Sequence, residues 1–138
     1  MDSDDIAVSN RFELQLRYFV NQDCDICGGQ IDEFIDDPSN VVGRRLVPES
    51  NKELKVYMQK RCPFNHTTVM YKISAVMDAG SYQDWFCNED YYLWIRIALR
   101  EQKFENLPET LVKTRVGKDM YARRGGDKYL KVSWAFKN

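Results

Sequence analysis

The side chains best suited to chemistry in this sequence are carboxylates, and they gather at two places. Asp2, Asp4 and Asp5 fall within the first five residues, whereas Glu89 and Asp90 are adjacent much later in the chain. Three acids so close together, without a neighbouring base, repel one another unless a cation or a helix end offsets their charge. Hard divalent ions such as Mg²⁺ and Mn²⁺ prefer oxygen ligands of this kind and often bridge them to a substrate phosphate. The first group therefore indicates either a metal site or a solvated acidic segment.

The second acidic pair lies at the start of a helix that we predict from Asn88 to about Gln102. Asn88 is a good N-cap residue, and the two acids after it suit the positive end of the helix dipole. An apolar stripe at helical spacing should be buried and hold the first turn still. The stripe consists of Leu93, Trp94, Ile97 and Ala98. A carboxylate fixed in this way can act as a general base, although acids in a first turn are also ordinary dipole partners.

Cysteine and histidine offer a different chemistry. Cys24 and Cys27 form a C-x-x-C pair, and Cys62 stands four residues before His66, the only histidine. Four such side chains can bind zinc tetrahedrally. The intervals do not match a known zinc-ligand pattern, however, and residues three apart in a strand predicted at 24–27 point to opposite faces. We therefore favour free thiols in a reducing compartment, with a non-catalytic binding module that carries a structural zinc site as the alternative.

Two further segments are typical of ligand binding. Gly28 and Gly29 lie within a strand predicted from Ile26 to Ile35, where glycines indicate a bulge or a close approach by another backbone or a ligand. Arg123 and Arg124 stand beside two more glycines. Guanidinium groups suit phosphate, and glycine lets the backbone approach it. The same arginine pair is equally typical of a solvated turn.

The composition is that of an ordinary globular chain of one domain. Of its 138 residues, 43% are hydrophobic and 30% are charged, and the net charge is −1. This charge balance gives no electrostatic footprint for nucleic acid. No apolar run approaches the roughly 18 residues that cross a bilayer.

Hydrophobic periodicity and capping signals predict the elements that must position these residues. A first helix of about a dozen residues, capped by Ser9 or Asn10, should bury Phe12, Leu16, Phe19 and Val20. Later helices are predicted from the capping box at Ser50 to about Lys60, for a single turn after Ser74, from Asn88, and over a last segment from Tyr129 to Phe136. Strands are predicted at 26–35, 41–47, 66–72, 104–108 and 110–116, the last two separated by a proline turn.

The order of the motifs resembles the catalytic half of glycosyltransferase family 2, which has the GT-A fold. The motifs are an Asp-x-Asp at 2–4, a Gly-Gly strand, Phe-x-His-x-Thr-Val-Met at 64–70, Gly-x-Tyr at 80–82, Glu-Asp-Tyr-x-Leu-Trp at 89–94, Leu-Pro-Glu-x-Leu-Val at 107–112, and Arg-Arg-Gly-Gly at 123–126. The resemblance spans nearly the whole chain. It implies an inverting transfer of a sugar from a nucleotide-activated donor.

The resemblance also implies roles for both acidic groups. Asp2 and Asp4 would bind Mg²⁺ or Mn²⁺, with Asp4 as the direct ligand and Asp2 reaching the metal or the ribose. Asp5 would cap a helix. Asp90 would be the general base, supported by Glu89.

Further roles follow from the same resemblance for the donor and the acceptor. Gly28 and Gly29 would let the donor sugar lie against the backbone, and Arg123 and Arg124 would clamp its diphosphate. His66 would flank the acceptor cleft.

The expected fold is α/β, the C-terminal part of a Rossmann-like GT-A domain with a mixed sheet and flanking helices. The N-terminal nucleotide-binding half, roughly a hundred residues in this family, would be missing. We therefore expect little activity from the isolated chain, and self-association through the surface that the missing half would cover.

The expected partners are a nucleotide-sugar donor, by default a UDP-hexose, and a saccharide or lipid-linked acceptor in cell-surface polysaccharide synthesis. No Gln-x-x-Arg-Trp run is present, which favours transfer of a single sugar. The expected location is cytoplasmic, at the inner face of the membrane for the parent protein.

Overall fold

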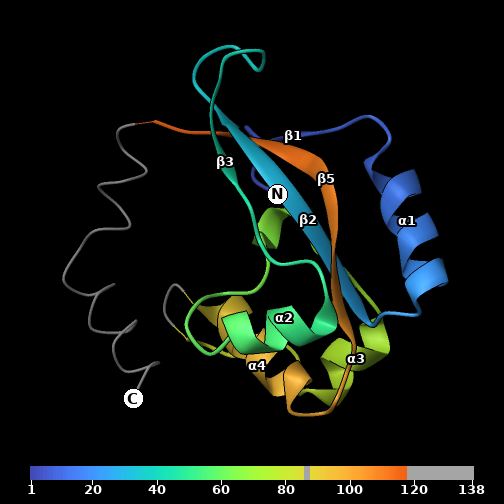
Figure 1. Cartoon of the computed structure of the whole chain (residues 1–138). Coiled ribbons are helices and arrows are strands. Elements are labelled where there is room, and N and C mark those ends of the chain that lie inside the picture. Colours follow the sequence, from blue (N-terminus) through green and yellow to red (C-terminus); the bar gives the residue numbers. More distant parts are fainter. Residues whose placement is uncertain (86–87, 118–138) are drawn as a thin grey trace.

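Short helices alternate with the strands of one sheet along this chain (Figure 1). The computed structural model describes residues 1–85 and 88–117. The elements in chain order are β1 (Ile6–Ala7), α1 (Arg11–Gln22), β2 (Ile26–Phe34), β3 (Val41–Arg45), α2 (Asn51–Tyr57), the 3-10 helix η1 (His66–Thr68), β4 (Met70–Tyr71), α3 (Ile73–Asp78), α4 (Glu89–Ala98) and β5 (Phe104–Arg115). Arg123, Arg124 and the last predicted helix lie outside the described residues.

The sheet is mixed, as predicted. β2 and β5 pair in parallel, from Ile26 opposite Phe104 to Phe34 opposite Arg115. β1 pairs antiparallel with β5, while β3 and β4 pair antiparallel with different parts of β2. The strand order is therefore β1-β5-β2-β3, with β4 beside the start of β2. This arrangement confirms the α/β class with a mixed sheet flanked by helices.

β5 is one continuous strand where the sequence predicted two strands and a proline turn. Gly28 lies opposite Asn106 and Gln30 lies opposite Thr110, so three residues of β5 face the single residue Gly29. Pro108 is in the middle of this irregularity. A bulge can hold a proline because the ladder hydrogen bonds are already interrupted there. The predicted turn is therefore wrong, whereas the bulge predicted from Gly28 and Gly29 is confirmed.

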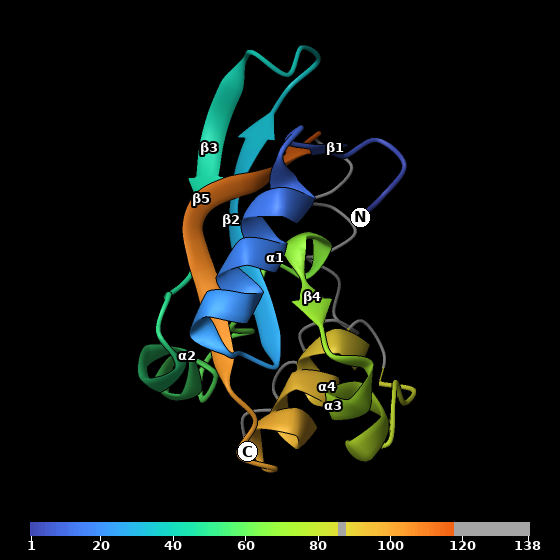
Figure 2. The same cartoon turned by 90° about the vertical axis from the view of Figure 1, so that its right-hand side faces the viewer.

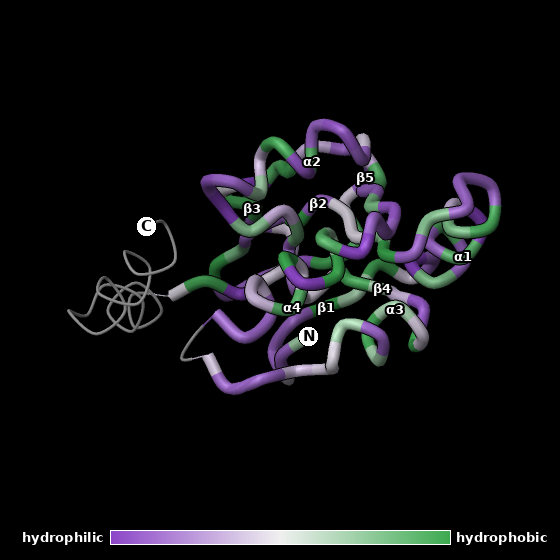
Figure 3. The backbone as a smooth tube through the Cα atoms, turned by 90° about the horizontal axis from the view of Figure 1, so that it is seen from below, coloured by the Kyte–Doolittle hydropathy of each residue, from purple (hydrophilic) through white to green (hydrophobic). Residues whose placement is uncertain are grey.

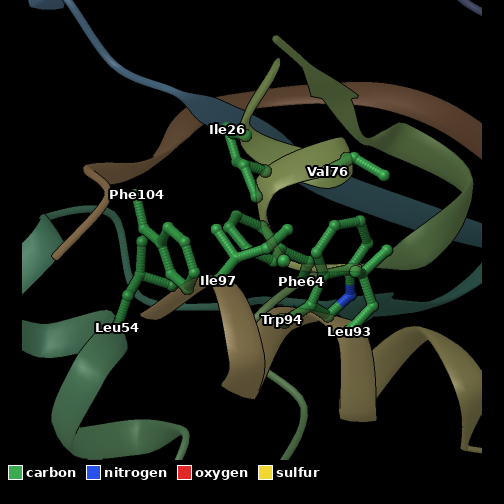
Figure 4. Packing of buried hydrophobic residues seen from close by; sticks show 10 residues of the cluster. Ile26, Leu54, Phe64, Val76, Leu93, Trp94, Ile97 and Phe104 are labelled. Atoms are coloured by element: carbon green, nitrogen blue, oxygen red, sulfur yellow. The ribbon is translucent and has the colours of Figure 1, made fainter. Parts of the chain in front are cut away.

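The larger apolar cluster lies where β2 and β5 begin, among α2, α3 and α4 (Figure 4). Leu93, Trp94 and Ile97 of α4 are fully buried in it, as the helical spacing predicted. Phe64 packs edge-on against Trp94, with ring centroids 5.5 Å apart. Replacing a buried aromatic residue by alanine typically costs about 3–5 kcal/mol. This cluster is thus sufficient to fix α4 and the acids at its start.

The exposed side of α1 contains three of the four residues that we predicted to be buried. Phe12, Leu16 and Val20 are 69%, 60% and 71% exposed. Of the four residues predicted to be buried, only Phe19 packs toward the sheet, together with Leu14 and Tyr18, beside a second apolar cluster. That cluster consists of Cys24, Cys27, Ile31, Leu107, Leu111 and Val112. The polar residues Arg11 and Gln15 are also buried, and their hydrogen bonds, described below, explain why this face turns inward.

The start signals of the other helices were right for α2 and wrong for α3, because α3 (Ile73–Asp78) begins before Ser74, the residue predicted to cap it. Ser50 and Glu53 form the predicted capping box at α2, but the helix ends at Tyr57 rather than near Lys60. The β-prone segment 66–72 is only partly a strand, because its first residues form η1. Among the described residues, no helix has the length and apolar character needed to cross a bilayer.

The helices divide between two sides of the β2–β5 pair. α2 lies on one side, and α3 and α4 lie on the other, as two perpendicular views show (Figures 2 and 3). The N-terminus lies on the same side as α3 and α4. Both acidic groups of the sequence therefore belong to one side of the molecule, which a shared site would require.

Candidate active site

Asp90 occupies the first turn of α4, where its carboxylate is mostly buried and Glu89 is exposed. Asn88 stands at the N-cap position, but its side chain makes no capping hydrogen bond with the helix. The helix is held by its apolar face instead, since Leu93 and Trp94 follow Asp90 within one turn and are fully buried. Asp90 therefore has a fixed backbone and a side chain that still reaches solvent.

His66 lies beside Asp90. The His66 Nδ1 atom is 3.6 Å from the Asp90 Oδ2 atom, and the imidazole is half exposed. The ring also lies near Trp94, with centroids 6.4 Å apart. The two residues are far apart in the sequence and come from different elements, η1 and α4. The structure thus brings together the predicted base and the residue predicted to lie on the acceptor side.

Hydrogen bonds on either side of His66 fix η1 on β2. The Asn65 Nδ2 atom donates to the Gly29 and Arg45 carbonyl oxygens, at 2.9 and 3.0 Å. The Thr68 hydroxyl donates to the Asn65 carbonyl oxygen at 2.7 Å and accepts from the Gly29 N–H at 3.0 Å. Asn65 and Thr68 are both buried, so these bonds are shielded from competing water. They fix the backbone that presents His66 to Asp90.

A further set of contacts connects η1 to the start of the chain. The Gln15 Nε2 atom donates to the Thr68 carbonyl oxygen at 2.7 Å, and Arg11 Nε donates to Gln15 Oε1 at 2.9 Å. The Arg11 Nη1 atom then contacts Met1 Sδ at 3.6 Å. Because Met1 precedes the acidic group, this contact series joins the predicted metal ligands to the helix that carries His66.

The acidic segment itself forms a turn. The Asp5 N–H donates to the Asp2 carbonyl oxygen at 3.2 Å, and the Asp2 N–H donates to the Asp5 carboxylate at 2.9 Å. Asp5 therefore closes this turn. The prediction that it caps a helix is wrong. The Asp2 and Asp4 side chains are exposed and have no hydrogen-bonding or ion-pairing partner among the described residues. Two exposed carboxylates are a donor set that fits Mg²⁺ or Mn²⁺, and their metal-binding role stays a prediction.

Packing accounts for both glycines of β2. A Cβ atom on Gly28 would lie 2.6 Å from Asn106 Oδ1, and one on Gly29 would lie 2.5 Å from Leu111 Cδ1. Both glycines are buried, and η1 and β5 fill the space that a side chain would need. The predicted contact between the donor sugar and this backbone is not tested by that packing and stays a prediction, as does the diphosphate clamp at Arg123 and Arg124.

The zinc alternative is wrong, since its four ligands do not meet. Cys24 and Cys27 lie in the apolar cluster under α1, whereas Cys62 packs against the cluster around α4 and His66 pairs with Asp90. Burial and, to a smaller extent, the charge of Asp90 raise the pKa of the Cys62 thiol to about 12. Within residues 1–85 and 88–117, no three His, Cys, Asp or Glu side chains are grouped to hold a metal ion. The cysteines of this part of the chain are free thiols.

Sequence reasoning missed Tyr71 and Tyr82 as members of this site. The Tyr71 ring lies 6.3 Å from Trp94, centroid to centroid, on the ring that also contacts His66. Burial first, and then the charges of Tyr71, Asp90 and Glu89, raise the pKa of the Tyr82 hydroxyl to about 12. The Gly-x-Tyr pattern at 80–82 was the available signal, but it gives no direction for the side chain.

Comparison with known sequences identifies the family of this chain. No family model matches the chain. A Haemophilus influenzae protein named as an uncharacterized glycosyltransferase is 46% identical over 136 residues, which is 97% of this chain and 50% of that protein. The amylovoran biosynthesis glycosyltransferase AmsE of Erwinia amylovora is 36% identical over 95% of this chain and 49% of its own length. The chain belongs to a glycosyltransferase family.

A third relative of this chain has a more specific name. It is an Escherichia coli UDP-Gal:alpha-D-GlcNAc-diphosphoundecaprenol beta-1,3-galactosyltransferase, 37% identical over 93% of this chain and 46% of that enzyme. The chain spans about half the length of each of these curated relatives.

Proposed function

We propose that this chain is the metal- and acceptor-binding part of a family 2 glycosyltransferase with the GT-A fold. The enzyme would transfer a single hexose from a nucleotide-sugar and invert its anomeric configuration. The observation that supports this most directly is the pairing of His66 with Asp90 at the start of α4, in a chain whose relatives are named glycosyltransferases. The order of the motifs from Asp2 to Trp94 supports the same assignment.

Asp90 is the general base in this proposal. Its carboxylate accepts the proton of an acceptor hydroxyl as the hydroxyl oxygen attacks the anomeric carbon of the donor. The bond between that carbon and the diphosphate oxygen breaks on the opposite face, so the configuration inverts and the diphosphate leaves with the nucleotide. His66 lies beside the carboxylate and is half exposed, where it can contact the acceptor. Glu89 supports the base from the same helical turn.

Asp2 and Asp4 would hold the divalent metal in this proposal. Their carboxylates are exposed, and oxygen ligands of this kind suit Mg²⁺ and Mn²⁺. When bound, such an ion neutralises the charge that grows on the leaving diphosphate. Arg123 and Arg124 would bind the same diphosphate through their guanidinium groups. The donor and acceptor ends of the reaction thus use residues from distant parts of the chain.

The substrates are proposed from the chemistry of the relatives. One relative is named for transfer from UDP-Gal to GlcNAc-diphosphoundecaprenol, and another for amylovoran biosynthesis. We therefore propose a UDP-hexose donor and a saccharide or lipid-linked acceptor in cell-surface polysaccharide synthesis, at the cytoplasmic face of the membrane.

The test is substitution of Asp90 by Asn in the natural polypeptide that carries this sequence. Transfer of labelled hexose from UDP-glucose, UDP-galactose or UDP-GlcNAc to a synthetic GlcNAc-diphosphate-lipid acceptor would be measured with Mn²⁺ present. Asp90→Asn keeps the size and polarity of the side chain but cannot accept the proton. We expect kcat to fall by about 10²–10⁴-fold, the usual contribution of a general base.

Asp78→Asn is the matched control, because Asp78 is an exposed carboxylate at the end of α3, outside the site. It should transfer sugar like the unaltered protein. Undiminished transfer by Asp90→Asn would remove the proposed base, and absence of transfer with every donor and acceptor would remove the proposed function.

A further inference from the structure

Arg11, the first residue of α1, is a buried arginine without an acidic partner. It is only 7% exposed, and in the described part of the chain it forms no ion pair. Arg17, Arg44 and Arg45 are exposed, yet each of them pairs with a carboxylate. Arginine is seldom buried to this extent unless an opposite charge accompanies it, because burial removes the water that solvates the guanidinium group.

The contacts of Arg11 hold its guanidinium group in place without neutralising it. The Nε atom donates to Gln15 Oε1 at 2.9 Å, and the Gln15 amide is in turn fixed by its hydrogen bond to the Thr68 carbonyl oxygen at 2.7 Å. The Nη1 atom contacts Met1 Sδ at 3.6 Å, and the Cζ atom lies 5.5 Å from the centroid of the Phe12 ring. A thioether is a weak acceptor, and an exposed aromatic ring offers a cation only a modest attraction.

Burial also lowers the pKa of the Arg11 guanidinium from its ordinary value, and the nearby Cys27 opposes this shift in part. An arginine nevertheless stays charged in a protein. The positive charge of Arg11 is therefore present and largely uncompensated in the described part of the chain. An anion at the terminal nitrogens would supply both the missing charge and the missing acceptors.

The group that covers the Arg11 terminal nitrogens is replaceable. Met1 is 58% exposed, and an unbranched methionine side chain adapts its conformation easily. Asp2 follows Met1 directly, and the Asp2 and Asp4 side chains are exposed. An anion that displaces the Met1 thioether would thus bind next to the acidic segment.

We propose that Arg11 binds the diphosphate of the sugar donor, and that the diphosphate displaces the Met1 side chain from the guanidinium group. This inference rests on the proposed function and adds a donor-binding residue to it. The guanidinium fork matches two oxygens of one phosphate. A diphosphate offers a second phosphate to the divalent metal proposed at Asp2 and Asp4, whereas a carboxylate offers a single pair of oxygens.

This placement connects the two ends of the proposed reaction. Gln15 bonds both Arg11 and the Thr68 backbone of η1, and η1 carries His66, whose Nδ1 atom lies 3.6 Å from Asp90 Oδ2. One series of contacts therefore holds the residue that binds the leaving diphosphate and the residues that face the acceptor. The fixed charge of Arg11 would stabilise the negative charge that grows on the diphosphate as it leaves.

The test measures binding of inorganic pyrophosphate to the 138-residue chain by isothermal titration calorimetry, at constant ionic strength and with Mg²⁺ present. Arg11→Met keeps the apolar stem of the side chain but removes its charge. We expect this variant to bind pyrophosphate about tenfold more weakly or less, as loss of a hydrogen bond to a charged group implies. Arg11→Lys should lose a smaller factor, because it keeps the charge without the planar fork.

Arg17→Met is the matched control. Arg17 lies on the same helix and pairs with Glu13 at 2.7 Å, with both side chains 67% exposed, and its replacement should leave pyrophosphate binding unchanged. Both methionine variants keep Arg123 and Arg124, so binding by those arginines is common to them. Thermal unfolding of each variant shows whether it is folded.

A measurement on the unaltered chain decides the question if Arg11→Met does not fold. The Nε–H signal of Arg11 in a ¹H–¹⁵N NMR spectrum should shift as pyrophosphate is added, and acetate at equal ionic strength should shift it far less.

Three results would overturn the site: no shift of the Arg11 Nε–H signal, equal pyrophosphate binding by Arg11→Met and Arg17→Met, or an equal response to acetate, which would indicate a carboxylate partner instead. These results are distinguishable from failure of the proposed function. If Asp90→Asn abolishes transfer while Arg11→Met binds pyrophosphate normally, the Arg11 site is wrong and the transferase stands. If Arg11→Met loses pyrophosphate although no sugar is transferred, the site stands without the transferase.

Discussion

Asp25 joins three segments of the chain at the start of β2. Its carboxylate accepts from the Lys103 N–H at 2.8 Å and from Lys72 Nζ at 2.9 Å. Its carbonyl oxygen accepts from the Lys72 N–H at 2.9 Å. Partial burial alone would raise the pKa of Asp25, but the Lys103 N–H and the Lys72 ammonium outweigh it and hold the pKa below its usual value. The carboxylate therefore stabilises the folded chain in its charged form.

We expect Asp25→Asn to lower the free energy of unfolding by about 1–3 kcal/mol at about pH 7, the range for a hydrogen bond to a charged group. The folded pKa lies below the unfolded value of about 3.9, so this stabilisation is complete above the unfolded pKa and disappears as the pH falls through the folded pKa. Urea unfolding of both proteins between about pH 7 and pH 3 measures the difference.

The difference between Asp25→Asn and the unaltered chain should shrink toward zero at the acid end. Asp78→Asn, an exposed carboxylate on α3, should change the stability little at either pH. If the difference in the free energy of unfolding between Asp25→Asn and the unaltered chain stays constant over the whole pH range, the charge of Asp25 is not the cause of that difference.

The residues of the site differ in how far the sequence could predict them. The position of Asp90 in a first turn, followed by a buried apolar stripe, could be predicted from the sequence pattern, whereas its role as base was implied only by the family resemblance. From the sequence, only the family resemblance indicated that His66 would lie on the same side of the site as Asp90. The position of η1 in the structure shows that the two side chains pair. Tyr71 was not identifiable as a neighbour of the site, since the contact of its ring with Trp94 has no signal in residue type or spacing.

At the scale of the secondary-structure elements, β2 and β5 pair in parallel along most of their lengths and pack tightly at Gly29. The bulge of β5 places the Glu109 carbonyl oxygen and the Leu111 side chain over Gly29. Leu111 is fully buried, so it has little room to move. The absence of a side chain on Gly29 is therefore a requirement of strand packing, and no left-handed φ is involved.

We expect Gly29→Ala to lower the free energy of unfolding by about 1–3 kcal/mol, the usual cost of overpacking a core. The new Cβ would lie 2.5 Å from Leu111 Cδ1 and 3.2 Å from the Glu109 carbonyl oxygen. Urea unfolding measures the loss.

Gly43→Ala is the control within the same sheet. A Cβ atom there would meet only the Glu33 side chain, with its nearest approach to Oε2 at 3.1 Å. The end of the Glu33 side chain can move. The change in stability should stay within about 0.5 kcal/mol. Equal stability of Gly29→Ala and Gly43→Ala would mean that β5 shifts easily and that Gly29 is kept for another reason.

Neither the start signals nor the apolar patterns of the helices were reliable throughout: Asn88 makes no capping hydrogen bond although the apolar stripe of α4 is buried as predicted. The capping box at Ser50 is a local arrangement, and it formed as predicted. Local sequence could not predict which side of α1 faces the sheet. Phe12, Leu16 and Val20 have the spacing of a buried stripe, yet they are exposed. Gln15 decided the outcome, since its amide bonds the Thr68 carbonyl oxygen, 53 positions away in the sequence. A buried polar residue with a distant partner cannot be recognised from periodicity.

For the molecule as a whole, the general arrangement was predictable and the placement of its parts was not. The resemblance to a GT-A domain predicted the α/β class with a mixed sheet, and the structure confirms it. The position of both acidic groups on one side of the β2–β5 pair (Figures 2 and 3) depends on how η1 and α1 pack on β2. Those contacts involve Arg11, Gln15 and Thr68, whose pairing the sequence does not indicate.

The apolar residues of α1 lead to a prediction about association. Phe12, Leu16 and Val20 are four residues apart and so form one stripe along the helix, with 60–71% of each exposed. Contiguous apolar surface of this kind is usually a contact surface. We expect the isolated chain to self-associate through this stripe. Sedimentation velocity over a wide range of concentrations should give a mass that rises above the 16.3 kDa of the monomer.

Leu16→Glu tests the location of the contact, because it puts a charge at the centre of the stripe without altering the buried face of α1. Its mass should stay near that of the monomer at concentrations where the unaltered chain associates. Val56→Glu is the matched control, since Val56 is 61% exposed on α2 and should leave association unchanged. If Leu16→Glu associates as strongly as Val56→Glu, the contact lies elsewhere on the molecule. If no protein associates at any concentration, α1 exposes its apolar stripe without a partner in the isolated chain, and the predicted self-association is wrong.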